Sequence, residues 1–195
     1  MNREIYPKVK LIISESMKEA KSFDDTKVRP EHIVLSMLND DDNECVKILR
    51  KLKVDTTELH DKISDYLRKN DLTPRVTQTG RTKPPFSNET KQIFKMVDAE
   101  CEKLNDKMID TIHIMLAILG SKLPTTKILS ELNVNYISFK NMIMQTRNDT
   151  PKNAFEDDPM NDDFGDERDE LNNTLTSTGK IFHLDNVIAY KTHSN

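Results

Sequence analysis

The sequence contains little of what several function classes require. It has two cysteines, four glycines and no tryptophan, and 35% of its 195 residues are hydrophobic. Two cysteines do not make a disulfide framework, so we expect Cys45 and Cys101 to be small buried residues in a reducing cytoplasm. No run of 18 apolar residues gives a membrane span, and the N-terminal residues lack the apolar core of a secretory signal. We therefore predict a cytoplasmic protein with no membrane partner.

The charge of the chain is concentrated at one end. Residues 151–195 hold ten acidic and four basic residues, a net charge of −6, whereas the whole chain has −4, so residues 1–150 carry +2 (−4 minus −6). A near-neutral domain gives no electrostatic reason to expect nucleic acid as a partner. The clustered acids and few apolar residues predict that 149–195 form a disordered, linker-like tail.

What the sequence does contain is an internal repeat. The segment 28–38, Val-Arg-Pro-Glu-His-Ile-Val-Leu-Ser-Met-Leu, returns about 80 residues later at 109–119 as Ile-Asp-Thr-Ile-His-Ile-Met-Leu-Ala-Ile-Leu. The two segments align position by position, with His32 on His113. A period of this size indicates two copies of one supersecondary unit.

The apolar spacing predicts the same order of helices in each copy: a long helix, a short apolar helix, another short helix and a medium one. Start signals include Pro30 and Pro124 at first helical positions and Ser87 as an N-cap, and Gly120 is expected to end a helix in the left-handed conformation. No stretch alternates between apolar and polar residues in the way that predicts a β-strand. We predict an all-α domain of two pseudo-symmetric four-helix repeats packed together. Its parts are repeat one at 1–69, a Pro- and Gly-containing linker at 70–86 and repeat two at 87–148.

The doubled motif resembles a known family. The sequences Pro-Glu-His-Ile-Val-Leu and Asp-Thr-Ile-His-Ile-Met-Leu, each followed by Ile-Leu-x-x-Leu-x-Val, are similar to the paired repeats of the Clp N-terminal domain, which precedes the ATPase rings of ClpA-, ClpB- and ClpC-type unfoldases. The resemblance covers residues 1–148. It looks closest to the ClpC type, whose linker the acidic tail also resembles.

The resemblance implies a recognition module for protein quality control and stress response, a chaperone-associated role without catalysis. The implied partners are unfolded or arginine-phosphorylated client proteins, Clp adaptor proteins, and the ATPase and protease subunits of a Clp complex. An alternative is a free-standing regulatory protein that docks on the Clp machine or competes for its adaptors. A third hypothesis, a small hydrolase or metal protein, is left open.

The nucleotide chemistry of the family needs a Gly-x-x-x-x-Gly-Lys-Ser/Thr loop. Only Gly179 is followed by lysine; Thr174 occupies the place of the first glycine, and Ile181 the place of the hydroxyl residue. We therefore expect no enzyme activity and no cofactor from this chain.

Metal and nucleophile chemistry have equally little support in the sequence. His32 and His113 each lack a second histidine three or four residues away, so we expect packing residues and no metal site. Neither Cys45 nor Cys101 has the glycine-framed or turn context of a nucleophile.

The similarity to the ClpC type also implies a phosphoarginine pocket in each repeat. The implied pocket pairs the glutamate of the Glu-His motif, which can hold a guanidinium, with a Ser/Thr at the start of the first helix, whose N–H groups attract phosphate. Copy one has Glu31 but Tyr6 at the hydroxyl position; copy two has Ser87 but Ile112 in place of the glutamate, next to Thr111. We expect copy one to be the better site, with phosphoarginine binding lost in Glu31→Ala and little changed in Ser87→Ala.

Overall fold

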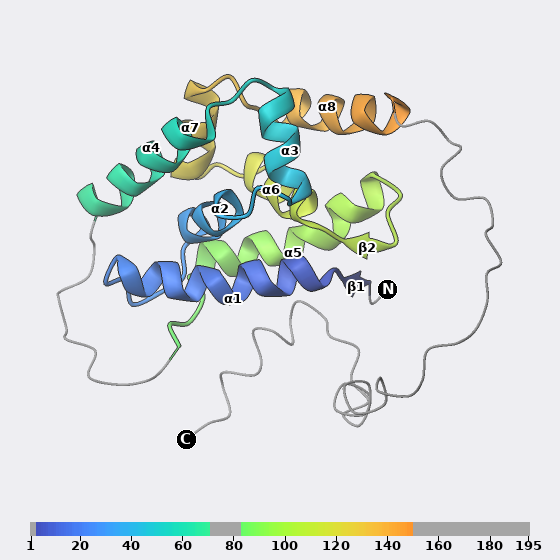
Figure 1. Cartoon of the computed structure of the whole chain (residues 1–195). Helices are drawn as coiled ribbons and strands as arrows, with labels where there is room; N and C mark the ends of the chain where they lie inside the picture. The colour runs from blue at the N-terminus through green and yellow to red at the C-terminus, as the bar shows by residue number, and fades with distance from the viewer. Residues whose placement is uncertain (1–2, 71–82, 150–195) are drawn as a thin grey trace, which may run out of the picture.

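The computed structural model describes residues 3–70 and 83–149, which form eight α-helices and two short strands (Figure 1). Most of the predicted linker and nearly all of the predicted acidic tail lie outside the described residues. The first repeat contains β1 (Glu4–Ile5), α1 (Pro7–Ser22), α2 (Pro30–Leu38), α3 (Glu44–Lys51) and α4 (Thr56–Lys69). The second contains α5 (Asn88–Lys103), β2 (Met108–Ile109), α6 (Thr111–Leu119), α7 (Pro124–Glu131) and α8 (Tyr136–Asp149).

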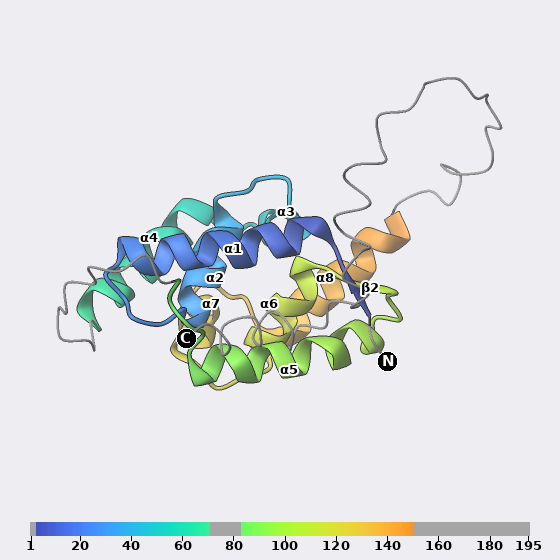
Figure 2. The same cartoon turned by 90° about the horizontal axis from the view of Figure 1, so that it is seen from below.

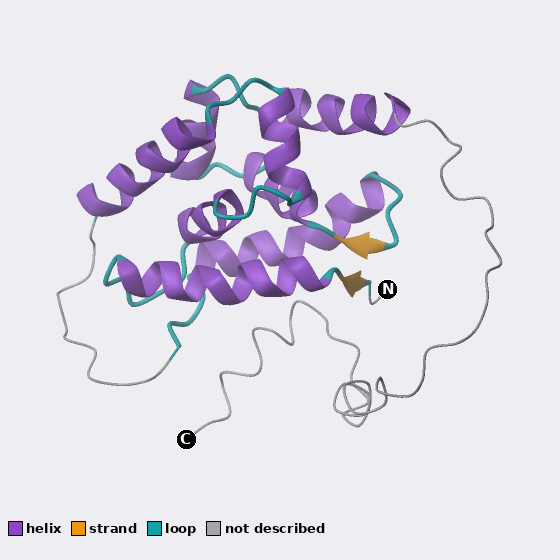
Figure 3. Cartoon of the chain, viewed as in Figure 1, coloured by secondary structure: helices purple, strands orange, loops and turns teal. Residues whose placement is uncertain are grey.

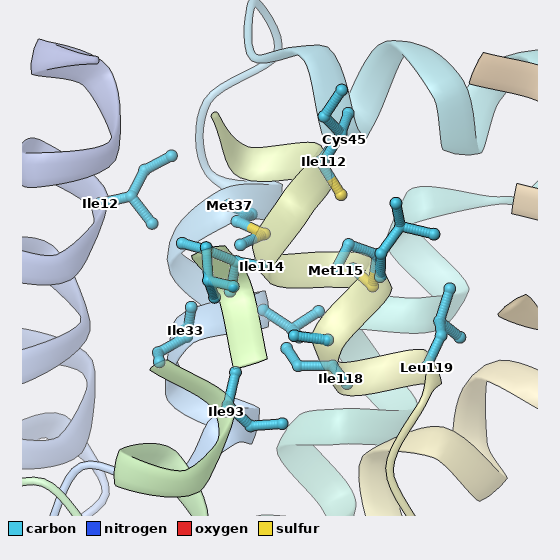
Figure 4. Close-up of a cluster of buried hydrophobic side chains, with 14 of the residues drawn as sticks. Ile12, Ile33, Met37, Cys45, Ile93, Ile112, Ile114, Met115, Ile118 and Leu119 are labelled. Atoms are coloured by element: carbon cyan, nitrogen blue, oxygen red, sulfur yellow. The ribbon is translucent and has the colours of Figure 1, made fainter. Parts of the chain in front are cut away.

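The two apolar helices α2 and α6 form the centre of the molecule. They lie between α1 and α5 when the domain is seen from below (Figure 2), and α3, α4, α7 and α8 cover the opposite side (Figure 1). Side chains of α2 and α6 meet in the core, among them Ile33, Met37 and Ile114 (Figure 4). No single helix of the described chain is long and apolar enough to cross a membrane; α6 and α7 reach that length only together, with a bend of 96°.

The helix starts follow the local signals in the sequence. Pro30 and Pro124 occupy first helical positions, where the missing N–H costs no hydrogen bond. Ser87 caps α5 by accepting a hydrogen bond from the backbone N–H of Thr90, and Asp55 caps α4 in the same way. The predicted helix starts at Pro30, Ser87 and Pro124 are therefore confirmed.

The helix ends show a regularity that the sequence did not indicate. Four residues just after α1, α3, α5 and α7 have a positive φ: Asp24, Lys53, Asn105 and Asn133. They fall in two corresponding pairs, so the repeats end their odd-numbered helices alike. The prediction for Gly120 was wrong, since it ends α6 with φ −75°.

Each repeat binds the start of the other. Strands β1 and β2 pair in parallel with Ile5 opposite Ile109 (Figure 3), and the corresponding bridge joins Phe86 to Val28. The backbone N–H of Tyr6 bonds to the carbonyl of Ile109 at 3.0 Å, and that of Ser87 bonds to the carbonyl of Val28 at 2.9 Å. We call these two pairings the exchanged clasps.

The second clasp includes a residue of the predicted linker. Phe86, assigned to the linker, is 3% exposed and packs edge-on against Phe94, with 5.1 Å between the ring centroids. The residues just before α5 therefore belong to repeat two, as residues 3–5 belong to repeat one. The strand pairs are only two residues long, too short to give a period-two sequence signal.

Candidate recognition pockets

The exchanged clasps bring Glu31 and Ser87 to the same pocket. The bridge between Val28 and Phe86 places the start of α5 beside the start of α2. As a result, Glu31 and Ser87 line the same pocket, which has a volume of about 390 Å³. We call this the Glu31–Ser87 pocket. Its remaining lining residues are Asp25, Thr26, Lys27, Arg29, Pro30, Tyr66, Glu89, Leu123 and Pro124.

This arrangement overturns the expected pairing within each repeat. The glutamate of copy one lies with the hydroxyl residue of copy two in one pocket, and Tyr6 lies with Ile112 in the other. One pocket therefore holds both of the implied residue types and the other holds neither. The expectation that Ser87→Ala leaves the Glu31 site unchanged rested on the wrong pairing.

Glu31 is held in the Glu31–Ser87 pocket by a residue of the second repeat. Glu31 lies in the first turn of α2 and is 3% exposed. Its Oε1 accepts a hydrogen bond of 2.7 Å from the hydroxyl of Thr125, in the first turn of α7. Burial, followed by the charge of Glu31, raises the pKa of the neighbouring Tyr66 phenol. The pocket thus contains a fixed carboxylate, the group that best holds a guanidinium.

A basic side chain forms part of the wall of the same pocket. The Arg29 guanidinium bonds to Asp25 Oδ2 through Nε at 3.0 Å and Nη2 at 2.6 Å. Asp25 Oδ2 also lies 3.1 Å from His32 Nε2. Burial opposes the charge on Asp25, but contacts with His32 and Arg29 outweigh burial and lower the pKa of this carboxyl. Arg29 is therefore fixed in position with its charge matched by Asp25.

The start of α5 supplies the anion-binding end of the pocket. Glu89 lies in the first turn of α5, and its pKa is lowered by a hydrogen bond from its own backbone N–H and another from the Ser87 hydroxyl. A helix start stabilises negative charge through free N–H groups and the helix dipole. The backbone N–H and the hydroxyl that lower the pKa of Glu89 are groups that can also hold a bound anion.

The second pocket has a volume of about 310 Å³ and is built at the corresponding positions. We call it the Tyr6–Ile112 pocket. Its other lining residues are Glu44, Ile48, Asp106, Lys107, Met108, Asp110, His113, Ile143, Thr146 and Arg147. Thr111, which the resemblance implied as a site residue, does not line it: Thr111 is fully buried, and its Oγ1 accepts a hydrogen bond from the backbone N–H of Cys45 at 3.1 Å.

The two repeated histidines are structural, as their repeated position indicated. His113 Nδ1 accepts a bond of 2.8 Å from the backbone N–H of Asp110, and its Nε2 lies 2.8 Å from Asp106 Oδ2. His32 Nδ1 accepts from the backbone N–H of Arg29 at 2.9 Å. Burial lowers the pKa of His113, and the nearby Asp106 offsets only part of that effect. Each histidine thus bonds to the start of its own helix.

The described part of the chain contains no cluster of metal ligands and no exposed cysteine. No group of three or more His, Cys, Asp or Glu residues there could hold a metal ion. Cys45 and Cys101 are unpaired and buried, and burial raises the pKa of both thiols, to about 11 for Cys101. A buried thiol with a raised pKa is a poor nucleophile.

Comparison with known proteins identifies the family of the two-repeat domain. Residues 5–132 match the family described as the Clp repeat (R) N-terminal domain. This chain belongs to that family. The ClpB chaperone of Clostridium tetani is 26% identical over 143 residues, which are 72% of this chain and 16% of ClpB. The chain thus spans about a sixth of the length of the curated relatives it matches. Closeness to the ClpC type in particular stays a prediction.

Solved structures share the fold of this Clp repeat domain. The N-terminal domain of Hsp104 from Candida albicans superposes with a TM-score of 0.61 at 14% identity, covering 74% of this chain and 91% of that one. The N-domain of ClpV from Vibrio cholerae gives a TM-score of 0.60 at 14% identity, covering 75% and 86%. The two-repeat helical fold predicted from the sequence is therefore confirmed.

Proposed function

We propose that this Clp repeat domain is a recognition module that receives protein clients or adaptors for a Clp-type unfoldase and its protease. Membership of the family and two pockets at corresponding positions support this role. The partners we expect are unfolded client proteins, Clp adaptors, and the ATPase and protease subunits of the complex. The pockets would serve this role whether the domain works within an unfoldase or apart from one. Its buried, unpaired thiols suit the cytoplasm.

We further propose that the Glu31–Ser87 pocket binds phosphorylated arginine on clients. The observation that carries this proposal is the meeting of Glu31 with the start of α5 in one cavity. A carboxylate can hold a guanidinium through two hydrogen bonds, and the helix start with the Ser87 hydroxyl can hold the phosphate. The side chain of Lys27, at the rim, adds a positive charge for the same phosphate.

Titration calorimetry of the chain with phosphoarginine tests this assignment. Glu31→Gln should weaken binding about 10- to 100-fold, because a hydrogen bond to a charged group contributes about 1.5–3 kcal/mol. Ser87→Ala should weaken it by a few-fold. Loss of the cap also lowers stability by about 1 kcal/mol, so a matched cap variant is needed.

Asp55→Ala is that control, because it removes the cap of α4, where Asp55 accepts from the backbone N–H groups of Thr57 and Glu58. It should lower stability in the same way and leave phosphoarginine binding unchanged. Binding that is as strong in Glu31→Gln as in the native chain would refute the assignment. An arginine-phosphorylated model client, compared with its dephosphorylated form, extends the test to proteins.

A further inference from the structure

The buried carboxylate of the Glu31–Ser87 pocket has no cationic partner. Glu31 is 3% exposed, and its Oε1 accepts a hydrogen bond from the Thr125 hydroxyl. No described residue donates a hydrogen bond to its second oxygen, Oε2, or forms an ion pair with it. The Arg29 guanidinium in the same lining is held by Asp25 instead. Burying an ionised carboxylate without a cation costs free energy, so this pocket favours a ligand that brings a positive charge.

The charges that line the whole pocket favour a cation as well. Its acidic side chains are Asp25, Glu31 and Glu89, and its basic side chains are Lys27 and Arg29, which gives a net charge of −1. Asp25 and Arg29 pair with each other at 2.6 Å. Two carboxylates and one ammonium group therefore remain for a ligand, and a ligand with one positive charge balances them.

The second carboxylate lies at the end of the pocket where a phosphate would bind. Glu89 is in the first turn of α5, two residues after the Ser87 cap, and its side chain is exposed. It accepts hydrogen bonds from its own backbone N–H and from the Ser87 hydroxyl. A phosphate must displace the Glu89 carboxylate from these groups, whereas a cation is attracted by it. Glu89 therefore acts in opposite directions on a guanidinium and on its phosphorylated form.

We propose that the Glu31–Ser87 pocket also binds the unmodified side chain of arginine, with the guanidinium between the carboxylates of Glu31 and Glu89. A guanidinium carries N–H donors on both edges of its plane, so one group can serve two carboxylates. Tyr66, in the same wall, supplies an aromatic ring of the kind on which guanidinium groups stack. The inference rests on the recognition role proposed above, and it makes Glu89 the residue that sets the balance between unmodified and phosphorylated arginine.

The test is an NMR titration of the full ¹⁵N-labelled chain at low salt with the peptide acetyl-Gly-Arg-Gly-amide. The matched neutral ligand is the same peptide with citrulline, which keeps the shape of arginine without its positive charge. Amide signals at the starts of α2 and α5 should shift. The arginine peptide should bind at least about fivefold more tightly than the citrulline peptide and than acetyl-Gly-Lys-Gly-amide, because only the guanidinium can bond to both carboxylates as a charged fork.

Variants of the two carboxylates provide an independent readout. Glu31→Gln should remove binding of the arginine peptide. Glu89→Gln should weaken it about two- to fivefold, as expected for loss of one exposed charge pair, while phosphoarginine binding becomes tighter. A damaged fold would weaken both ligands, so opposite changes identify a role in specificity. The control Glu58→Gln replaces an acid in the first turn of α4, outside the pocket, and should leave both affinities unchanged.

Three results would overturn the proposal: an arginine peptide that binds no more tightly than the citrulline or lysine peptide, native binding by Glu31→Gln, or an arginine affinity that Glu89→Gln does not lower. Failure of this proposal is distinguishable from failure of the phosphoarginine assignment. A native chain that binds phosphoarginine but not the arginine peptide overturns only the present inference. A chain that binds the arginine peptide but not phosphoarginine overturns only the earlier assignment.

Discussion

Replacing Thr125 with valine tests how the pocket carboxylate is held. Valine keeps the shape of threonine and removes only the hydroxyl that donates to Glu31 at 2.7 Å. Thr125 is fully buried and Glu31 is 3% exposed, so the bond lies out of bulk solvent. A hydrogen bond to a charged group contributes about 1.5–3 kcal/mol, and we expect the free energy of unfolding to fall by that amount. Urea unfolding at 25 °C, followed by circular dichroism, measures it.

The matched control is Thr57→Val. Thr57 is the second residue of α4, as Thr125 is of α7, but its side chain is exposed. The control makes the same chemical change at the same helical position without a buried partner, so it should change stability by less than about 0.5 kcal/mol.

A double-mutant cycle separates this bond from other effects of the substitution. In a Glu31→Gln background, Thr125→Val should cost only about 0.5–1.5 kcal/mol, because the bond is then between neutral groups. Equal costs in both backgrounds, or a cost no larger than that of Thr57→Val, would refute the view that Thr125 positions the carboxylate.

Three further outcomes follow from the structure. Glu89→Gln should tighten phosphoarginine binding about 2- to 10-fold by calorimetry, because it removes a carboxylate that competes for the start of α5; weaker binding would contradict this. Because the pKa of His113 is lowered in the folded state, its contribution to stability is present above the unfolded pKa, about 6.5, and is lost as pH falls through the folded value. The melting temperature of the native chain should therefore drop between pH 7 and pH 5. The drop should be smaller in His113→Gln, whereas the control His60→Gln should show the same drop as the native chain. Lys53→Gly should raise the free energy of unfolding by about 1 kcal/mol, since Lys53 has φ 61°. Asn133→Gly should raise the free energy of unfolding by less, because asparagine already tolerates this conformation.

The helices were predictable because their signals are local. Apolar spacing, Pro30 and Pro124 at helix starts, and Ser87 as a cap act within one or two turns of the chain. The repeat itself added the expectation of two matched halves. These features survive in the structure because no long-range contact opposes them.

The composition of the pockets was not predictable from the same signals. A repeat of about 80 residues fixes which positions correspond, but it does not say which repeat supplies each wall. The clasp between Val28 and Phe86 decides that question, and its two-residue pairing leaves no period in the sequence. The bond between Thr125 and Glu31 joins residues 94 apart and likewise has no local signature. Of the pocket residues, only the place of Glu89 in the first turn of α5 could have been predicted, because Glu89 lies two residues after the Ser87 cap.

The exchanged clasps have a consequence for how such a domain changes over generations. Each cavity is lined by one decisive side chain from the first repeat and one from the second, and no residue lines both cavities. A single replacement therefore retunes one cavity and spares its counterpart. The residues at positions 6 and 112 can therefore differ from Ser87 and Glu31 without a change in the lining of the other cavity.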